Sequence, residues 1–366
     1  MKEIAIVGGG LAGAHAAALL ALEGLRPVLY ERRSGPGDKV CGEFLSADAQ
    51  ACLAATGFDL AALGGAPVSA LRVAAGARTV EAQLPFTALG ISRRRLDEAL
   101  LGHAARLGAV VHRGVVVREL AEGRLETSVG EARPAAIVLA SGKHEVRGAR
   151  RAAQERTNLI GFKTYFRLQP ESAAALAGAV ELIFFEGGYA GLQLVEDGCA
   201  NLCLLVGRDA FAASGQTWPA LLERLLREPH LARRLDGATE ALERPLSIAN
   251  LPFGHLVSPS PDDWVYRIGD QAAVIDSFTG DGMAIALRSA EIAALALACG
   301  ATPAQHHARL KKTLARPVGL ATWLRRRTEA WPGPGPALAA LALWPSLLSA
   351  FAAWTRAPPA TAPVRA

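Results

Sequence analysis

The sequence predicts an α/β protein in which a Rossmann-like nucleotide-binding domain carries an inserted α+β domain built on an antiparallel sheet. Three observations predict this fold. A strand, a glycine-rich turn, a helix and a second strand open the chain at 4–31. Short apolar runs separated by turn residues fill 156–252, as in an antiparallel meander. A second strand, glycine-rich turn and helix follow at 264–299.

The first of these stretches begins with the apolar run 4–7 (IAIV), which suits a buried parallel strand. Alanine and leucine dominate 11–22, which predicts a helix. A second strand over 27–30 ends at Glu31. Between the first strand and the helix, glycines stand in the spacing G-x-G-x-x-G, at Gly8, Gly10 and Gly13.

Each part of this pattern has a physical role in holding a dinucleotide. Gly8 makes the tight turn out of the strand, Gly10 lets a pyrophosphate approach the backbone, and Gly13 lets the helix lie close to the sheet. The helix N-terminus offers unpaired N–H groups and a partial positive charge to the phosphates. The Glu31 carboxylate can accept hydrogen bonds from an adenosine ribose, so the sequence predicts a dinucleotide site.

Composition excludes several classes of protein. The 366 residues are 51% hydrophobic and 20% charged, which is typical of a globular chain. The net charge of +5 is mild, and no basic run is interleaved with aromatic residues, so no nucleic-acid partner is expected. The five cysteines form no CxxC pair, which predicts neither a metal site nor a disulfide framework and favours a reducing cytoplasm.

The chain is expected to leave the nucleotide-binding domain twice and return to it each time, which makes four crossings between the two domains. Alternating runs at 70–74 and 79–84 predict strands of the second sheet, and those at 182–185, 191–195 and 201–206 predict its meander, with a helix near 218–235. Further strands are expected at 110–111, 115–117, 125–129 and 135–139. The expected division is 1–66, 91–155 and 262–330 for the nucleotide-binding domain, 67–90 and 156–261 for the substrate domain, and 331–366 for a helical, proline-rich tail.

Two residues that follow the first nucleotide-binding unit are candidates for the site. Cys41 stands beside a glycine in a loop, where it either approaches a cofactor ring or packs as a small buried hydrophobe before a helix capped by Ser46. Arg93 stands at the start of a helix, a poor place for a cation with respect to the helix dipole. It either meets a phosphate or adenine there, or belongs to a solvated basic face.

The strand at 135–139 ends in Ser141-Gly142 and a cluster of both charge signs. Ligands of α/β sheets bind beyond the carboxyl ends of strands, so Lys143, His144 and Arg147 are placed for a site, although an exposed loop would carry the same residues.

The second glycine-rich turn completes the predicted cofactor site. A strand near 264–268 ends in Gly269-Asp270, and Gly280, Gly282 and Met283 then open an apolar helix that runs to about Cys299. Asp270 can bind cofactor hydroxyls, and the two later glycines let a ring lie against a helix N-terminus. Two such turns predict one long cofactor that spans both.

The tail contains an uncharged stretch at 337–354 with a central proline. It is expected to form two short helices that pack on the second domain; an interfacial membrane contact and a membrane span are the alternatives.

These motifs resemble flavoproteins of the para-hydroxybenzoate hydroxylase and geranylgeranyl reductase superfamily. The resemblance rests on the glycine fingerprint with Glu31, on Arg93, and on GDQAAVIDSFTGDGM at 269–283, while VCGEFLS at 40–46 is closer to the reductase branch. It implies a Rossmann-like FAD-binding domain with FAD as the cofactor. The cofactor-binding residues it implies are Gly8, Gly10, Gly13, Glu31, Arg32, Cys41, Arg93, Gly269, Asp270, Gly280, Gly282 and Met283.

Two departures from the superfamily pattern leave the electron donor, NADPH or NADH, open. Ser277 stands where a proline is usual, and Ser141-Gly142 stands where the hydroxylases carry an Asp-Gly motif tied to pyridine nucleotides. Lys143 and Arg147 are candidate substitutes for that motif.

Three functions remain in view. The favoured one is a monooxygenase that hydroxylates or epoxidises a hydrophobic, aromatic or polyketide-like substrate. The alternative is a reductase or dehydrogenase of a prenyl-like or other unsaturated substrate, with Cys41 beside the flavin. A non-catalytic lipid-binding protein is disfavoured because the glycine fingerprint is intact. Catalytic candidates are Cys41, Lys143 and His144, and the W-x-W-x-I-P signature of halogenases is absent from the sequence.

Overall fold

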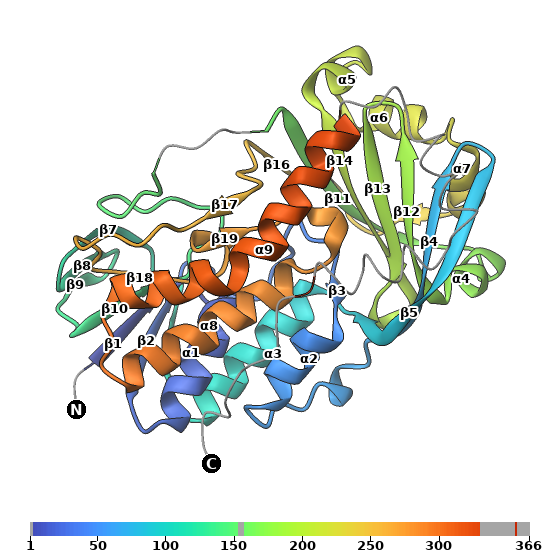
Figure 1. Cartoon of the computed structure of the whole chain (residues 1–366). Helices are drawn as coiled ribbons and strands as arrows, with labels where there is room; N and C mark the ends of the chain where they lie inside the picture. The colour runs from blue at the N-terminus through green and yellow to red at the C-terminus, as the bar shows by residue number, and fades with distance from the viewer. Residues whose placement is uncertain (1–2, 153–156, 330–355, 357–366) are drawn as a thin grey trace.

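The computed structural model describes residues 3–152, 157–329 and 356. Two sheets organise these residues (Figure 1). The first is a parallel sheet of strand order β18–β10–β1–β2–β6, and the second is a nine-stranded sheet that is mostly antiparallel. The predicted combination of a Rossmann-like parallel sheet with an antiparallel region is therefore confirmed.

The predicted strand–helix–strand unit lies at the centre of the parallel sheet. Strands β1 (Glu3–Val7) and β2 (Arg26–Glu31) pair in parallel, and helix α1 (Leu11–Leu22) connects them. Ten of the twelve residues of α1 are buried, so this helix is apolar on all sides. It can be so because it lies between the sheet on one side and helices α3 and α8 on the other.

Helices cover one face of the parallel sheet and a small antiparallel ribbon covers the other (Figure 1). Ser46 and Ser92 cap α2 and α3 through their hydroxyl groups. The other strands of the parallel sheet are β6 (Val110–Arg113), β10 (Ala136–Leu139) and β18 (Tyr266–Arg267). The helices are α2 (Ala47–Ala54), α3 (Arg93–Arg106), α8 (Gly282–Ala298) and α9 (Pro303–Glu329), and the ribbon is β7 (Val117–Ala121), β8 (Arg124–Thr127) and β9 (Gly130–Ala132).

The nine-stranded sheet collects segments from three parts of the chain. Its order is β15–β11–β14–β13–β12–β4–β5–β3, with β16 also paired to β11. Its strands are β3 (Phe44–Leu45), β4 (Ala66–Ala75), β5 (Arg78–Gly90), β11 (Leu159–Arg167), β12 (Gly178–Phe185), β13 (Gly188–Leu194), β14 (Cys199–Gly207), β15 (Thr239–Glu240) and β16 (Leu246–Ala249). A separate pair joins β17 (His255–Leu256) to β19 (Ala273–Val274).

The two faces of the nine-stranded sheet have different surroundings. One face packs into a hydrophobic cluster with the four helices α4 (Pro170–Leu176), α5 (Arg208–Ala213), α6 (Trp218–Leu225) and α7 (Pro229–Leu235). Along β12, Ile183 points into this cluster and is fully buried, whereas Leu182 and Phe184 on the opposite face are only half-buried. The second face therefore presents apolar side chains to a space that none of the described helices fills.

Several sequence-based expectations are corrected in detail. The expected helix over 218–235 is divided into α6, which ends at Leu225, and α7, which begins at Pro229. Proline is tolerated in the first turn of a helix but not in its interior, so Pro229 starts a new helix. Of the expected strand at 115–117, only Val117 belongs to β7, and the strand expected near 264–268 is reduced to Tyr266–Arg267. Helix α9 was not predicted.

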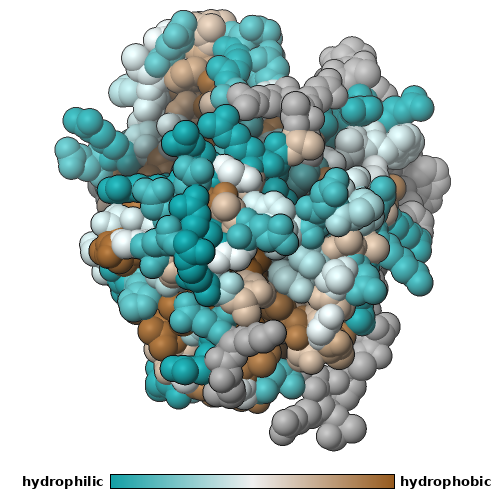
Figure 2. Space-filling view, turned by 90° about the vertical axis from the view of Figure 1, so that its left-hand side faces the viewer, coloured by the Kyte–Doolittle hydropathy of each residue, from teal (hydrophilic) through white to brown (hydrophobic). Residues whose placement is uncertain are grey.

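The surface at the left of Figure 1 is mostly hydrophilic, with apolar residues in small, separate patches (Figure 2). Within the described residues, no helix is both long enough and apolar enough to cross a membrane. The uncharged stretch predicted to pack or touch a membrane, 337–354, lies outside the described residues.

The close approach of α1 to β1 makes a prediction about Gly13. In a helix interior, Gly→Ala normally stabilises by up to about 1 kcal/mol. A methyl group at Gly13 would instead overlap the Gly8 carbonyl oxygen. We expect Gly13→Ala to lower the free energy of unfolding by about 1–3 kcal/mol, as overpacking does, in urea titrations of the apoprotein.

Gly319 provides the matched control. It lies inside α9 and a methyl group there would meet no atom within 4 Å. Gly319→Ala should leave the protein as stable as before or make it more stable. Equal effects of the two substitutions would contradict the packing role of Gly13.

Candidate active site

The two glycine-rich turns lie against each other. A methyl group at Gly269 would lie 3.1 Å from the Cβ atom of Ala12, in the first turn of α1. The Asp270 carboxylate lies 3.9 Å from the position of a Cβ atom at Gly142, at the carboxyl end of β10. Both turns line one cavity of about 2120 Å³. Drug-sized ligands occupy roughly 300–1,000 Å³, so this cavity has room for an extended cofactor and a further molecule.

The first turn presents a helix N-terminus to this cavity. Gly8 has a φ of +108°, which favours glycine, and a side chain there would lie 2.5 Å from the Ala140 carbonyl oxygen. Gly10 is the N-cap of α1 and no side chain caps the helix. A methyl group at Gly10 would lie 3.0 Å from the Lys39 ammonium. N–H groups of a helix start beside a cation suit a pyrophosphate.

The cations at this turn are held by a buried carboxylate. Arg93 donates to Asp97 through Nε and Nη2 over 2.7 Å and 2.9 Å, and Lys39 lies 2.6 Å from the same carboxylate. Burial alone would raise the pKa of Asp97, but Arg93 and Lys39 outweigh burial and lower it. Asp97 therefore fixes two cations beside Gly10 while neutralising one of them.

The Glu31 carboxylate lies at the end of β2, where the sequence predicts a ribose contact. It accepts a hydrogen bond of 2.7 Å from the Gly9 N–H and one of 2.9 Å from the Arg33 N–H. Both bonds come from backbone groups, so they orient the carboxylate without using other side chains. Glu31 lines the cavity together with Arg32.

The charged cluster after β10 divides between the cavity and the surface. Lys143 and His144 line the cavity, and Arg32 donates to His144 Nε2 over 2.7 Å. Burial lowers the pKa of His144, and the neighbouring Arg32 lowers it further, so the ring is neutral near pH 7. Arg147 instead pairs with Glu119 at 3.5 Å on the exposed side of the loop.

The second turn is held by contacts with its backbone. The Ser289 hydroxyl accepts from the Gly269 N–H over 2.7 Å, and Arg151 donates to the Asp270 carbonyl oxygen over 2.8 Å. Gln271 donates to the carbonyl oxygens of Gly142 and His144, so this turn and the loop after β10 form one unit. The Asp270 side chain lines the cavity.

The start of α8 forms another part of the cavity wall. Gly280 has a φ of +72°, and a methyl group there would lie 2.9 Å from the ring of Phe44. A methyl group at Gly282 would meet no atom within 4 Å, so the first turn of α8 is open to a flat ring. Met283 lines the cavity, and Ser277 is hydrogen-bonded to the Tyr189 hydroxyl over 2.6 Å.

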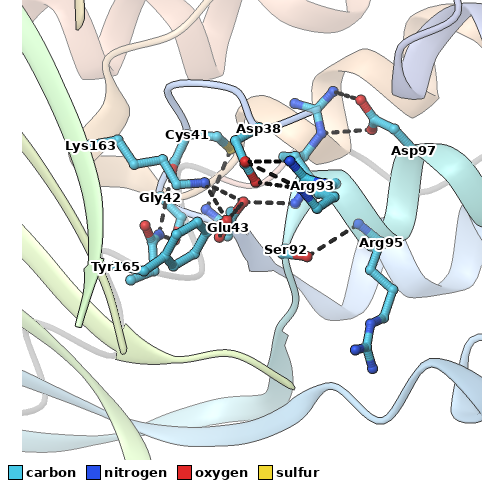
Figure 3. A network of polar contacts seen from close by, with 12 residues as sticks. Asp38, Cys41, Gly42, Glu43, Ser92, Arg93, Arg95, Asp97, Lys163 and Tyr165 are labelled. Carbon is cyan, nitrogen blue, oxygen red and sulfur yellow. Dashed lines mark hydrogen bonds and ion pairs between the residues drawn. The ribbon is translucent and has the colours of Figure 1, made fainter. Parts of the chain in front are cut away.

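Sequence analysis did not identify a buried polar network at the cavity that joins β11 of the nine-stranded sheet to the loop before β3 and to the start of α3 (Figure 3). Glu43 is fully buried with a φ of +61°, and its carboxylate pairs with Lys163 of β11, which is also fully buried. The Tyr165 hydroxyl donates to both Glu43 oxygens over 2.9 and 3.0 Å, and the Arg93 N–H donates over 2.7 Å. Burial raises the pKa of Glu43, and Lys163, Arg93 and Tyr165 oppose this shift.

The same network fixes the loop that carries Cys41. Gln193 donates to the carbonyl oxygens of Gly42 and Glu43, and Asn201 donates to those of Cys41 and Gly42. Cys41 is half-buried on the cavity wall, and its sulfur accepts a 3.4 Å bond from the Glu43 N–H. The structure thus places Cys41 on the cavity wall, where it also packs against the core of the nucleotide-binding domain.

A sequence signal for this network exists in β11. Its residues LIGFKTYFR place Phe162, Thr164 and Phe166 on one face of the strand. Lys163 and Tyr165 then share the other face, and a lysine in mid-strand between aromatic residues indicates a buried partner charge. The partner itself could not be read from the sequence, since Glu43 is 120 residues away.

The remaining wall is the open face of the nine-stranded sheet. It is apolar, with side chains from five strands and from the segment after β16. The residues that form this apolar wall are Leu71, Val73, Leu84, Val180, Leu182, Phe184, Leu205, Ile248, Leu251 and Phe253. One end of the cavity is therefore polar and suits a nucleotide, and the other end is apolar.

These features fit an FAD molecule. The helix start at Gly10 with Lys39 and Arg93 suits its pyrophosphate, Glu31 its ribose, and the open turn at Gly282 its ring. Within residues 3–152, 157–329 and 356, no cluster of His, Cys, Asp or Glu is placed to hold a metal ion.

The sequence of the chain is similar to a known domain family and to a known protein. Residues 6–43 match the family model of the NAD(P)-binding Rossmann-like domain. The chain is 26% identical over 318 residues to a menaquinone reductase of Mycolicibacterium smegmatis, a match that covers 81% of this chain and 76% of the relative.

Solved structures share the fold over nearly the whole chain. The flavin-dependent brominase Bmp2 aligns with a TM-score of 0.80 at 17% identity, covering 97% of this chain and 93% of its own. A geranylgeranyl bacteriochlorophyll reductase-like protein from Thermoplasma acidophilum aligns with a TM-score of 0.70 at 18% identity, covering 95% and 91%. These matches confirm the predicted Rossmann-like fold of the FAD type, the resemblance to flavoproteins of this kind, and FAD as the cofactor that the fold takes.

The position of Glu31 makes a prediction about cofactor affinity. A hydrogen bond to a charged group contributes about 1.5–3 kcal/mol, so Glu31→Ala should weaken FAD binding by on the order of tenfold to a hundredfold. Titration of the apoprotein with FAD, followed by flavin fluorescence, measures this change. An unchanged dissociation constant would remove Glu31 from the cofactor site.

The buried Glu43–Lys163 pair makes a prediction about stability. Lys163→Met leaves the Glu43 carboxylate buried without its countercharge, and breaking a buried pair in this way costs about 3–5 kcal/mol. The double variant Glu43→Gln/Lys163→Met removes both charges and should recover part of the loss in urea unfolding. A double variant as unstable as the sum of the two single variants would contradict the coupling.

Proposed function

We propose that this protein is a flavin-dependent reductase of an apolar, unsaturated substrate, such as a polyprenyl chain or a quinone. The proposal starts from its fold, which is that of FAD-dependent oxidoreductases. One observation carries the proposal. The apolar wall and the nucleotide-binding turns line the same cavity, so an apolar molecule on that wall would lie beside the cofactor. The sequence relative named menaquinone reductase supports this class of substrate.

The residues of the chain would bind and orient both molecules and exclude water from them. Bound FAD, once reduced by NADPH, NADH or another two-electron donor, would supply the two electrons of the reduction. Saturating a double bond also adds two protons to the substrate. The Cys41 thiol and the Tyr189 hydroxyl both line the cavity near the apolar wall. Burial raises the pKa of Tyr189, so that hydroxyl keeps its proton at neutral pH.

The loop at 40–44 favours a reductase over the monooxygenase that the sequence analysis ranked first. The buried network on Glu43 holds Cys41 at the cavity wall, where a thiol can serve as a proton donor. Likeness to halogenases extends to the fold alone, and the sequence lacks the W-x-W-x-I-P signature. The monooxygenase stays a prediction, because a dry, apolar cavity would serve it as well.

Anaerobic turnover separates the two reactions. We expect the reduced holoenzyme, mixed under nitrogen with a polyprenyl quinone in detergent, to reoxidise its flavin and to yield a product that has gained two hydrogen atoms, measured by mass spectrometry. Flavin that is reoxidised only by oxygen, with labelled oxygen in the product, would establish the monooxygenase instead.

Two cysteine variants test the proton donor in the same assay. Cys41→Ser should lower the anaerobic rate by on the order of a hundredfold, which is a typical contribution of general acid catalysis. Cys299→Ser is the matched control, because Cys299 is exposed and does not belong to the cavity wall. A Cys41→Ser variant with the full rate would exclude Cys41 as the donor.

A further inference from the structure

We propose that helix α9 docks this protein on the surface of an anionic lipid bilayer. Its contact surface is a stripe of exposed side chains along the helix, formed by Arg309, Lys312, Arg316, Trp323 and Arg327, which we call the α9 stripe. Figure 1 shows α9 running alongside α8 and reaching toward the nine-stranded sheet.

Helical geometry places the α9 stripe on one side of α9. Its members are three, four, seven and four residues apart, and residues with such spacing share a face of a helix. The opposite face is occupied by the protein core, because Leu310, Leu314 and Val318 are buried in a cluster with α8. At 1.5 Å per residue, the stripe extends for about 27 Å, long enough to contact many lipid headgroups at once.

The charge of α9 has one sign. The helix carries no acidic residue before Glu329, at its very end. The four cations of the α9 stripe are exposed. Clusters of Lys and Arg on a helix are attracted by the negative potential of an anionic leaflet, and this attraction falls off within a Debye length, about 10 Å at 0.1 M salt.

One end of the α9 stripe lies at the cavity. Trp323 is 55% exposed, and the Arg327 guanidinium lies over its ring at 5.6 Å. Both residues also line the cavity, as does Leu324 between them. Tryptophan is favoured where water meets lipid, because its ring is apolar and its N–H is polar. A bilayer on the stripe would therefore lie next to the cavity wall.

This arrangement favours lipid over nucleic acid as the partner. A surface for single-stranded nucleic acid usually combines its cations with several stacking aromatic residues, whereas the α9 stripe has one aromatic residue, at the cavity. The choice of a lipid bilayer as the partner also rests on the proposed function, because an apolar substrate dissolved in the bilayer would enter the cavity directly from the bilayer. The docking itself needs no substrate and no turnover.

Vesicle co-sedimentation of the full-length holoprotein tests the proposal. We expect binding to vesicles of phosphatidylcholine mixed with phosphatidylglycerol, little binding to phosphatidylcholine alone, and loss of binding at high salt. The variant Arg309→Gln/Lys312→Gln/Arg316→Gln removes three cations from the α9 stripe. Each cation near an anionic surface contributes about fivefold, so the variant should bind on the order of a hundredfold more weakly.

A control variant separates the stripe from total charge. Arg78→Gln/Arg118→Gln/Arg167→Gln removes three exposed cations from other parts of the surface. It should retain binding to the mixed vesicles. Equal losses in both variants would show that net charge alone is responsible and would overturn the proposal.

Three further results would also overturn it: no binding to the mixed vesicles, unchanged binding of the stripe variant, or tighter binding of duplex DNA than of the mixed vesicles at the same salt. Unchanged binding would assign the contact to another part of the chain. Because sedimentation uses neither substrate nor reductant, failure of the proposed reaction would leave the docking result standing, and the reverse is also true.

Discussion

The buried ion pair between Glu43 and Lys163 joins the two halves of the site. Glu43 belongs to the loop that follows the first nucleotide-binding unit, and Lys163 belongs to the nine-stranded sheet. Neither charge is exposed to water, so each would be costly to bury without the other. The pair therefore requires the sheet to lie against the loop, and this contact sets the distance between the apolar wall and the nucleotide-binding turns.

The same constraint explains the backbone at Glu43. A φ of +61° is rare for a residue with a side chain and costs on the order of 1 kcal/mol or more. The carboxylate is held in place by Lys163, Tyr165 and the Arg93 N–H, and its own carbonyl oxygen by Gln193. Enough bonds therefore converge on this residue to keep the unusual conformation.

Local signals predicted much of the fold. The spacing of Gly8, Gly10 and Gly13, the strands on either side and the cap at Ser46 all depend on near neighbours in the chain, and all appear where the sequence places them. Errors arose where tertiary contacts decide. The strand expected near 264–268 is shortened to Tyr266–Arg267, because the chain turns into Gly269, whose N–H is held by Ser289 of α8.

The site was predictable only where a residue's place follows from a known local geometry. Glu31 follows a strand and Gly10 precedes a helix, so their surroundings can be inferred from the pattern. The partners of Glu43 and the apolar wall come from strands more than a hundred residues away, and no periodicity reports such pairing. Arg93 lies between these cases. Its place at a helix start indicated an anion, and the structure shows that two of its guanidinium nitrogens already donate to Asp97.

Asp97 also shows how a cationic site can be stable before its anion arrives. Lys39 and Arg93 lie near the positive end of α1, where their mutual repulsion and the helix dipole would drive them apart. The buried carboxylate bonds both and leaves one net positive charge facing Gly10. A pyrophosphate would then meet cations that are already in place. The entropy cost of ordering these two long side chains would be incurred when the protein folds, so it would not reduce the affinity for the pyrophosphate.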